Sequence, residues 1–208
     1  ARHGLAELLL RGTDAGTRLA AADALGELES ADSLDALGQA AREDESWSVR
    51  VAAVTALGRM PDARAIVVLL EVLEKGSGRL IDDVVAALED QSGQSFSDNA
   101  TLWREWYEKD GAPLGERCRQ LADAAPPEAV RTIEEIGKSR FLCGVRNLLG
   151  LLGANGHAPA TPLAPELTDP AREAVGQALA GVKKRAVRER NVERLLLAAE
   201  RLELPGAI

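Results

Sequence analysis

The chain has 208 residues, of which 46% are hydrophobic and only 3% aromatic, and its formal net charge is −8. This apolar content argues against a disordered chain, and the length suits one or two packed domains. The charge is uneven, because residues 1–111 carry 11 Lys and Arg against 21 Asp and Glu, whereas residues 112–208 carry 14 against 12. An acidic first half repels nucleic acid and anionic lipid, so we expect neither as a partner.

The first predicted helix, at residues 4–11, looks like the second member of a helix pair. Leu5 and Leu9 align with Leu37 and Ala41 at an interval of 32 residues. A repeat helix without a preceding partner exposes an apolar face. Together with the start at Ala1, this favours a chain that forms part of a larger assembly.

A longer segment, Thr17–Leu28, returns 32 residues later as Val49–Met60. Such a period in helical sequence indicates stacked helix pairs. The apolar spacing predicts helices at about 15–29, 31–43, 47–60 and 63–75, with a degraded third copy at 80–88. Residues expected to face the core are Leu19, Ala22, Leu25, Leu28, Val51, Val54 and Leu57. Gly26 and Gly58 stand at the same place in both copies, which predicts that neighbouring backbones pass closely there.

Both copies carry the pattern Arg-x-x-Ala-x-x-Ala-Leu-Gly after an acidic turn, at Arg18–Gly26 and at Arg50–Gly58. This pattern resembles HEAT repeats of the phycobilisome-lyase type. The resemblance implies a right-handed stack of antiparallel helix pairs, in a family made mostly of adaptors with a minority of enzymes. It also implies that each Arg pairs with an acid at the repeat junction, Asp14 with Arg18 and Asp44 with Arg50. Binding of an acidic partner is the alternative role of these two arginines.

Residues 93–107 resemble a tail that follows the last repeat in bacterial HEAT proteins, with Ser92 where that pattern has Thr. Trp103, Trp106 and Tyr107 share one face of a helix. They are expected either to cap the open end of the stack or to form an aromatic patch for a partner.

We expect five regions, all of them helical except the fourth: HEAT-type repeats at 1–97, a Trp-containing capping helix at 98–111, a helical region at 112–152, an irregular Pro- and Gly-rich connection at 153–168, and C-terminal helices at 169–204. Asp169 followed by Pro170 is the predicted start of the last region. A basic stretch at 183–194 is interpreted as a solvated helix face.

Chemistry-bearing motifs are scarce. Cys118 and Cys143 lie on apolar helix stripes and are expected to be buried thiols. The spacing of the cysteine and histidine residues matches no metal-binding pattern, and no motif for a cofactor is present, so no cofactor is expected. No apolar run reaches the ~18 residues of a membrane span. We expect a cytoplasmic protein, and a periplasmic protein whose signal peptide has been removed is the alternative.

The sequence therefore predicts an all-α protein, a right-handed HEAT-type solenoid followed by a C-terminal helical region. Its expected function is that of a non-catalytic scaffold or adaptor for another protein with a basic surface. Candidate contact residues are Asp14, Asp44, Glu45, Trp47, Trp103, Trp106 and Tyr107. Trp47 is expected either to pack over its turn or to stand exposed as a contact. The alternative function is a subunit of an enzyme, of the HEAT-type lyase or HEAT-like DNA glycosylase kind.

Overall fold

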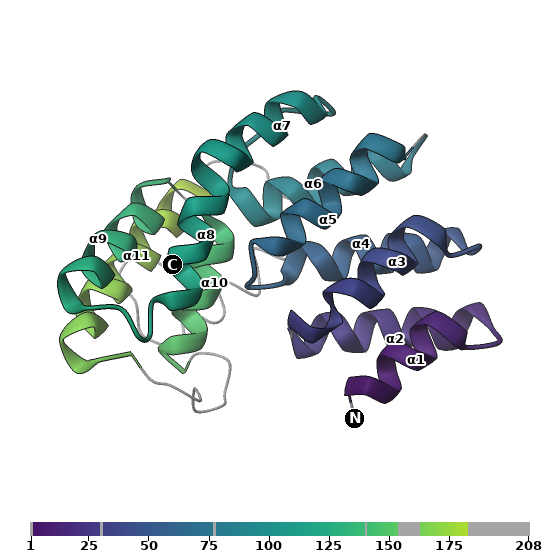
Figure 1. Cartoon of the computed structure of the whole chain (residues 1–208), viewed down its shortest axis with the longest axis horizontal. Coiled ribbons are helices and arrows are strands. Elements are labelled where there is room, and N and C mark those ends of the chain that lie inside the picture. The colour runs from purple at the N-terminus through teal and green to yellow at the C-terminus, as the bar shows by residue number, and fades with distance from the viewer. Residues whose placement is uncertain (1, 30, 77, 140, 154–162, 183–208) are drawn as a thin grey trace. The chain divides into compact units, whose positions relative to one another are not determined.

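The structure is a computed structural model, and it describes residues 2–29, 31–76, 78–139, 141–153 and 163–182. The chain divides into two compact units, Ala1–Glu108 and Lys109–Ile208. Every regular element in the described ranges is a helix, as predicted (Figure 1). None of these helices is long and apolar enough to cross a membrane.

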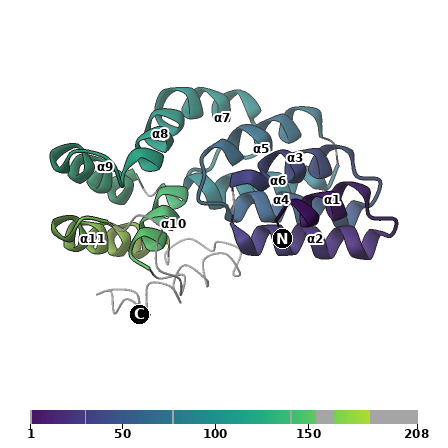
Figure 2. The same ribbon diagram turned by 60° about the horizontal axis from the view of Figure 1, so that its bottom comes forward.

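The first unit contains the predicted helix pairs. Its elements are α1 (Arg2–Arg11), α2 (Ala15–Leu28), the short 3-10 helix η1 (Ala31–Ser33), α3 (Leu34–Glu43), α4 (Trp47–Arg59), α5 (Arg64–Lys75), α6 (Leu80–Ser92) and α7 (Ala100–Trp106). Helices α2, α4 and α6 pack side by side as one layer, and α1, α3, α5 and α7 form the other (Figures 1 and 2). Helices α1, α3 and α5 also pack against the helices that follow them in the chain, α2, α4 and α6, so the pairs stack in chain order.

Two glycines set the spacing of the first layer. A Cβ placed on Gly26 of α2 would lie 2.9 Å from the Cβ of Ala56 on α4. A Cβ on Gly58 of α4 would lie 2.9 Å from the Cβ of Ala87 on α6. The two junctions therefore repeat one close helix–helix contact, which confirms the predicted approach of the backbones. In the third copy the equivalent residue is Glu89, whose carboxylate accepts a hydrogen bond from Ser95 Oγ at 2.5 Å.

The core of this unit follows the repeat. Leu25, Leu57 and Leu88 occupy equivalent places on α2, α4 and α6, and each is fully buried. Leu28 was expected on the same buried stripe, but that expectation is wrong, because its side chain is 43% exposed. Leu28 is exposed because α2 is the first helix of its layer in the described structure. Helix α4 has α2 and α6 on its two sides, whereas α2 packs mainly on α1 and α4.

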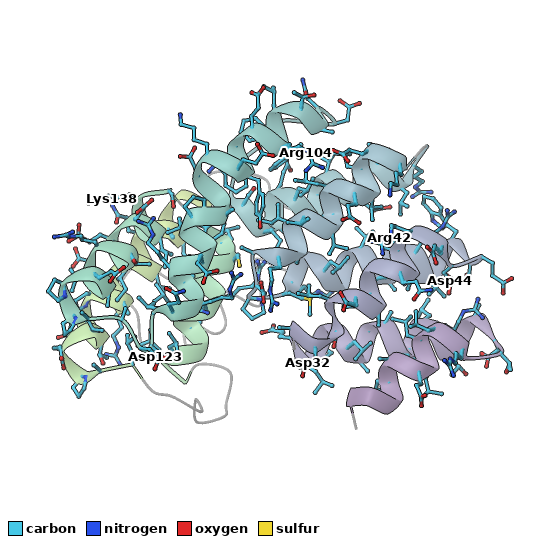
Figure 3. The ribbon with its side chains drawn as sticks, in the orientation of Figure 1. Asp32, Arg42, Asp44, Arg104, Asp123 and Lys138 are labelled. Carbon is cyan, nitrogen blue, oxygen red and sulfur yellow. The ribbon has the colours of Figure 1, made fainter. Side chains whose placement is uncertain are left out.

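Ion pairs join successive helices of the second layer. Arg42 of α3 pairs with Glu71 of α5 at 3.1 Å, and Arg104 of α7 pairs with Glu74 of α5 at 2.5 Å (Figure 3). These side chains are partly exposed, and such pairs contribute roughly 0–1 kcal/mol each. Burial of the leucines and alanines between the layers is therefore the dominant stabilising interaction.

The second unit contains α8 (Ala112–Gln120), α9 (Pro126–Ser139), α10 (Leu142–Leu151) and α11 (Pro165–Val182). A π-helical segment, η2 (Tyr107–Gly111), runs directly from α7 to α8. Helices α9 and α11 pack closely at Gly137, where an added Cβ would lie 3.0 Å from the Cα of Ala174.

The last described helix begins earlier than predicted. α11 starts at Pro165 and includes Pro170, so Asp169 is not its N-terminal cap. Pro170 is the sixth residue of α11, beyond the first four residues whose N–H groups lack intrahelical partners, so it removes one hydrogen bond to the Glu166 carbonyl and is unfavourable there. The predicted connection therefore ends before Pro165. The basic stretch at 183–194 and most of that connection lie outside the described residues.

Candidate functional site

The turn between α3 and α4 carries three predicted contact residues, Asp44, Glu45 and Trp47. Asp44 follows the last residue of α3 with an extended backbone (φ −62°, ψ 135°), and its N–H donates to the carbonyl of Ala40 at 3.1 Å. Its carboxylate turns back and accepts a hydrogen bond from the Ser46 N–H at 2.8 Å. A carboxylate that bonds the backbone two residues on defines an Asx turn. The start of α4 is therefore fixed by this side chain.

A buried ion pair anchors the same turn to α2. Arg18 donates from Nε to Asp44 Oδ2 at 2.8 Å and from Nη2 to Asp44 Oδ1 at 3.0 Å. It also donates to the Gly12 carbonyl at 3.0 Å and to Glu45 Oε1 at 3.1 Å. The Arg18 and Asp44 side chains are only 8% and 7% exposed, whereas Glu45 is 85% exposed. Arg18 thus joins the end of α1, α2 and the turn before α4.

The predicted pairing of Asp14 with Arg18 and of Asp44 with Arg50 is wrong. Arg18 binds Asp44, and Asp14 caps α2 by accepting from the Thr17 N–H at 2.8 Å and from Thr17 Oγ1 at 2.5 Å. An N-cap carboxylate lies beside the free N–H groups of its own first turn, which explains the position of Asp14. Stacking of the pairs brings the following turn to Arg18.

Hydrogen bonding and burial shift the pKa of the Asp44 carboxyl group in opposite directions. Burial by itself would raise the pKa of this carboxyl, but hydrogen bonds from Arg18 and the Ser46 N–H lower the pKa more, so it lies below its ordinary value of 3.8. Hydrogen bonds from Thr17 lower the pKa of the exposed Asp14. Both residues therefore carry a full negative charge at neutral pH.

Trp47, the first residue of α4, is 37% exposed. The guanidinium carbon of Arg50 lies 5.4 Å from the centre of its ring, within the range of a cation–π contact. Trp47 therefore packs against Arg50 and stays partly exposed, while its role as a contact for a partner stays a prediction. Together with Glu45, it makes the turn a partly apolar, negatively charged surface.

A comparison with protein families matches this part of the chain, residues 3–89, to HEAT repeats. Residues 3–89 are HEAT repeats. The match confirms the resemblance read from the two Arg-x-x-Ala-x-x-Ala-Leu-Gly segments, while the phycobilisome-lyase type and the bacterial tail stay predictions. A search of curated proteins gives no match.

Beyond the matched HEAT repeats, the predicted aromatic face separates into a buried and a half-buried part. Trp103 is fully buried, its ring contacts Phe96 edge-on at 4.9 Å, and its Nε1 donates to the Ser97 carbonyl at 2.8 Å. Trp106, 6.2 Å from Trp103, and Tyr107 are half-buried. Trp103 is therefore part of the packed core of this unit and is not available to a partner.

Gln91 is a functional polar residue of the HEAT stack that the sequence analysis missed. Its side chain is fully buried, and Nε2 donates to the carbonyls of Leu57 at 2.6 Å and Met60 at 2.8 Å. It thus satisfies free carbonyls at the C-terminal end of α4. A signal existed, because Gln91 stands 31 residues after Met60, where the preceding copy has a buried apolar side chain.

The second unit offers weaker candidates. A cavity of ≈ 320 Å³ is lined by Arg117, Gln120, Asp123, Ala124, Ala125, Glu128 and Thr132. Arg117 already pairs with Glu135 at 2.6 Å, and the remaining charges are two carboxylates, so the lining favours no one ligand class.

Cys118 and Cys143 are buried free thiols, as predicted, and burial raises the pKa of Cys118 to about 12. Among the described residues, no three His, Cys, Asp or Glu side chains gather as a metal site.

Proposed function

We propose that this protein is a non-catalytic scaffold that binds another protein through the turn before α4, with Glu45 and Trp47 as the main contacts. Proteins built from stacked helix repeats use their extended surfaces in this way. The observation that carries the proposal is the combination of exposed Glu45 and Trp47 on a turn that the buried Arg18–Asp44 pair holds rigid.

Rigidity supports this role because an ordered surface loses little conformational entropy on binding. The turn is fixed by Arg18 and by the Asp44–Ser46 hydrogen bond, so its exposed side chains are already positioned. Tryptophan is also the residue type most often found at the energetic centre of protein interfaces.

The partner surface that suits this turn is basic. Residues 1–111 carry 21 acidic against 11 basic side chains, and Glu43 and Glu45 are exposed at the turn itself. Asp44 is not among the proposed contact residues, because its oxygens already accept hydrogen bonds from Arg18 and the Ser46 N–H. Asp14 caps α2 and adds its negative charge to this surface. A DNA glycosylase needs a basic groove for the phosphate backbone, and the acidity of the repeats favours the scaffold instead.

Fluorescence anisotropy with a labelled lysine-rich peptide tests this proposal on the full chain. We expect the double variant Glu45→Lys/Trp47→Ala to bind about tenfold more weakly, a loss of ~1.4 kcal/mol. Glu105→Lys is the matched control, because Glu105 is an exposed acid of α7 in the same unit and the substitution changes charge equally. Affinity that is unchanged in the double variant, or insensitive to salt in the wild type, would refute the proposal.

A further inference from the structure

The second repeat junction lacks a carboxylate that the first junction has. Arg50 stands 32 residues after Arg18 and occupies the same place in its repeat. Arg18 binds Asp44 through two parallel hydrogen bonds, but the residue 32 positions after Asp44 is Gly76, which has no side chain.

The backbone of the two turns is otherwise alike. Asp44 (φ −62°, ψ 135°) and Gly76 (φ −76°, ψ 165°) each follow the last residue of a helix and donate their N–H to a carbonyl of its last turn. A Cβ on Gly76 would approach the Val72 carbonyl oxygen to 2.5 Å, so a side chain here is sterically disfavoured. The chain therefore does not supply this second carboxylate from its own turn.

Asp44 does not fill the gap. Arg50 is close enough for its charge to help lower the pKa of Asp44, but the Asp44 oxygens are hydrogen-bonded to other groups. Oδ1 accepts from Arg18 Nη2 and from the Ser46 N–H, and Oδ2 accepts from Arg18 Nε. The Nε of Arg50 is buried and donates to no acceptor in the described structure. Burial of an unsatisfied donor is unfavourable, and a hydrogen bond from an incoming acceptor relieves it.

Trp47 completes the arrangement. Its ring contacts the Arg50 guanidinium at 5.4 Å, which holds the cation in place but provides no hydrogen-bond acceptor. Trp47 is 37% exposed at the start of α4, so this cation–π pair lies at the surface of the turn. Arginine presents a planar fork that matches a carboxylate, as Arg18 already demonstrates in this protein.

We propose that Arg50 and Trp47 form a carboxylate-binding site for an Asp or Glu side chain of the partner protein. This inference rests on the proposed function and sharpens it. The exposed Glu43 and Glu45 on the preceding turn repel an acidic segment, so the carboxylate must be flanked by basic residues. The partner segment is thus one acidic residue within a basic stretch.

The test uses the full chain and two labelled peptides of equal length. The first contains only lysine, serine and glycine, and the second replaces its central serine with glutamate. We expect the wild type to bind the glutamate peptide about tenfold more tightly, consistent with a charge-assisted hydrogen bond. Arg50→Gln is expected to bind both peptides equally.

Arg131→Gln, at an exposed position on α9, is the charge-matched control and should keep the preference. If Arg50→Gln does not fold, Arg50→Lys provides the test. Lysine keeps the positive charge but lacks the planar guanidinium, so this variant should lose most of the preference for the glutamate peptide. Equal affinity of the wild type for both peptides, or a preference that survives in these Arg50 variants, overturns the carboxylate site alone. Absence of binding to either peptide overturns the proposed function and this inference with it.

Discussion

Gly26 of α2 faces Ala56 of α4 so closely that a Cβ on the glycine would meet the alanine Cβ at 2.9 Å. Distances below 3 Å between such atoms require the helices to move apart. The same relationship recurs between Gly58 and Ala87, so the separation of the helices in this layer is set by glycine at both junctions.

We predict that Gly26→Ala destabilises the protein by roughly 1–3 kcal/mol, the usual cost of overpacking a tight contact. Alanine is the better helix former by about 0.5–1 kcal/mol, so the packing cost must exceed this gain. Gly4→Ala in α1 is the control, because nothing lies within 4 Å of its added Cβ, and it should be neutral or stabilising. Chemical denaturation of both variants measures the difference, and a stabilised Gly26→Ala would contradict the close contact.

Leu25→Ala and Leu57→Ala should each lower the free energy of unfolding by about 2–5 kcal/mol, because each removes a fully buried leucine and leaves a cavity. Leu28→Ala changes the same residue type in α2 at a site that is 43% exposed, and should cost less than about 1 kcal/mol. Urea denaturation compares the three. Similar losses at Leu25 and Leu28 would mean that the assigned faces of α2 are incorrect.

Asp44→Ala should destabilise the HEAT unit by roughly 3 kcal/mol, because it leaves the buried Arg18 charge without its bidentate partner. Glu45→Ala removes the other carboxylate bound by Arg18, but from a side chain that is 85% exposed, and should cost less than about 1 kcal/mol. Thermal unfolding followed by circular dichroism distinguishes them. Equal and small losses would show that the pair contributes little.

The lowered pKa of Asp44 also predicts a dependence of stability on acid. A carboxyl whose pKa is lower in the folded state stabilises the fold above its unfolded pKa, and this contribution is lost as the pH falls through the folded value. Stability from Asp44 should therefore be constant from neutral pH to about pH 5 and decline below the ordinary value of 3.8. Denaturation at a series of pH values should show a shallower acid decline in Asp44→Asn than in the wild type.

Cys118 and Cys143 should not react with a thiol reagent in the folded protein at pH 8. Both are buried, and the raised pKa of Cys118, about 12, leaves almost no thiolate, which is the reactive form. Titration with a chromogenic disulfide is expected to show no fast reaction natively and two equivalents in denaturant. Fast labelling of the native protein would place a thiol at the surface.

The pairing of the arginines shows how far sequence reasoning reached. The repeat itself located Arg18 and Arg50 at the junctions, because a period is visible without any structure. The family resemblance then implied that each arginine pairs with an acid of the turn before it, Asp14 or Asp44. The partner of Arg18 is in fact on the next turn, and sequence distance could not show this, since the contact forms only when two pairs stack.

The aromatic residues after the repeats give a second example. The spacing of Trp103, Trp106 and Tyr107 correctly placed them near one another, but it did not distinguish core from surface. The structure buries Trp103 against Phe96 and leaves Trp106 and Tyr107 half-buried. Which of several neighbouring apolar side chains is buried depends on the packing partner, and the sequence of one helix does not contain that partner.

The sequence by itself determined the helices of the repeats, the interval of 32 residues, the core positions of Leu25 and Leu57, and the glycines at the close contacts. These depend on periodicity and residue size, which are local properties of the chain. Tertiary structure alone decided that Asp44 belongs to Arg18, that Gln91 holds the end of α4, and that the Arg50 Nε has no acceptor among the described residues. Such polar contacts act over about 3 Å between residues far apart in the chain, so only the stacked helices determine which groups meet.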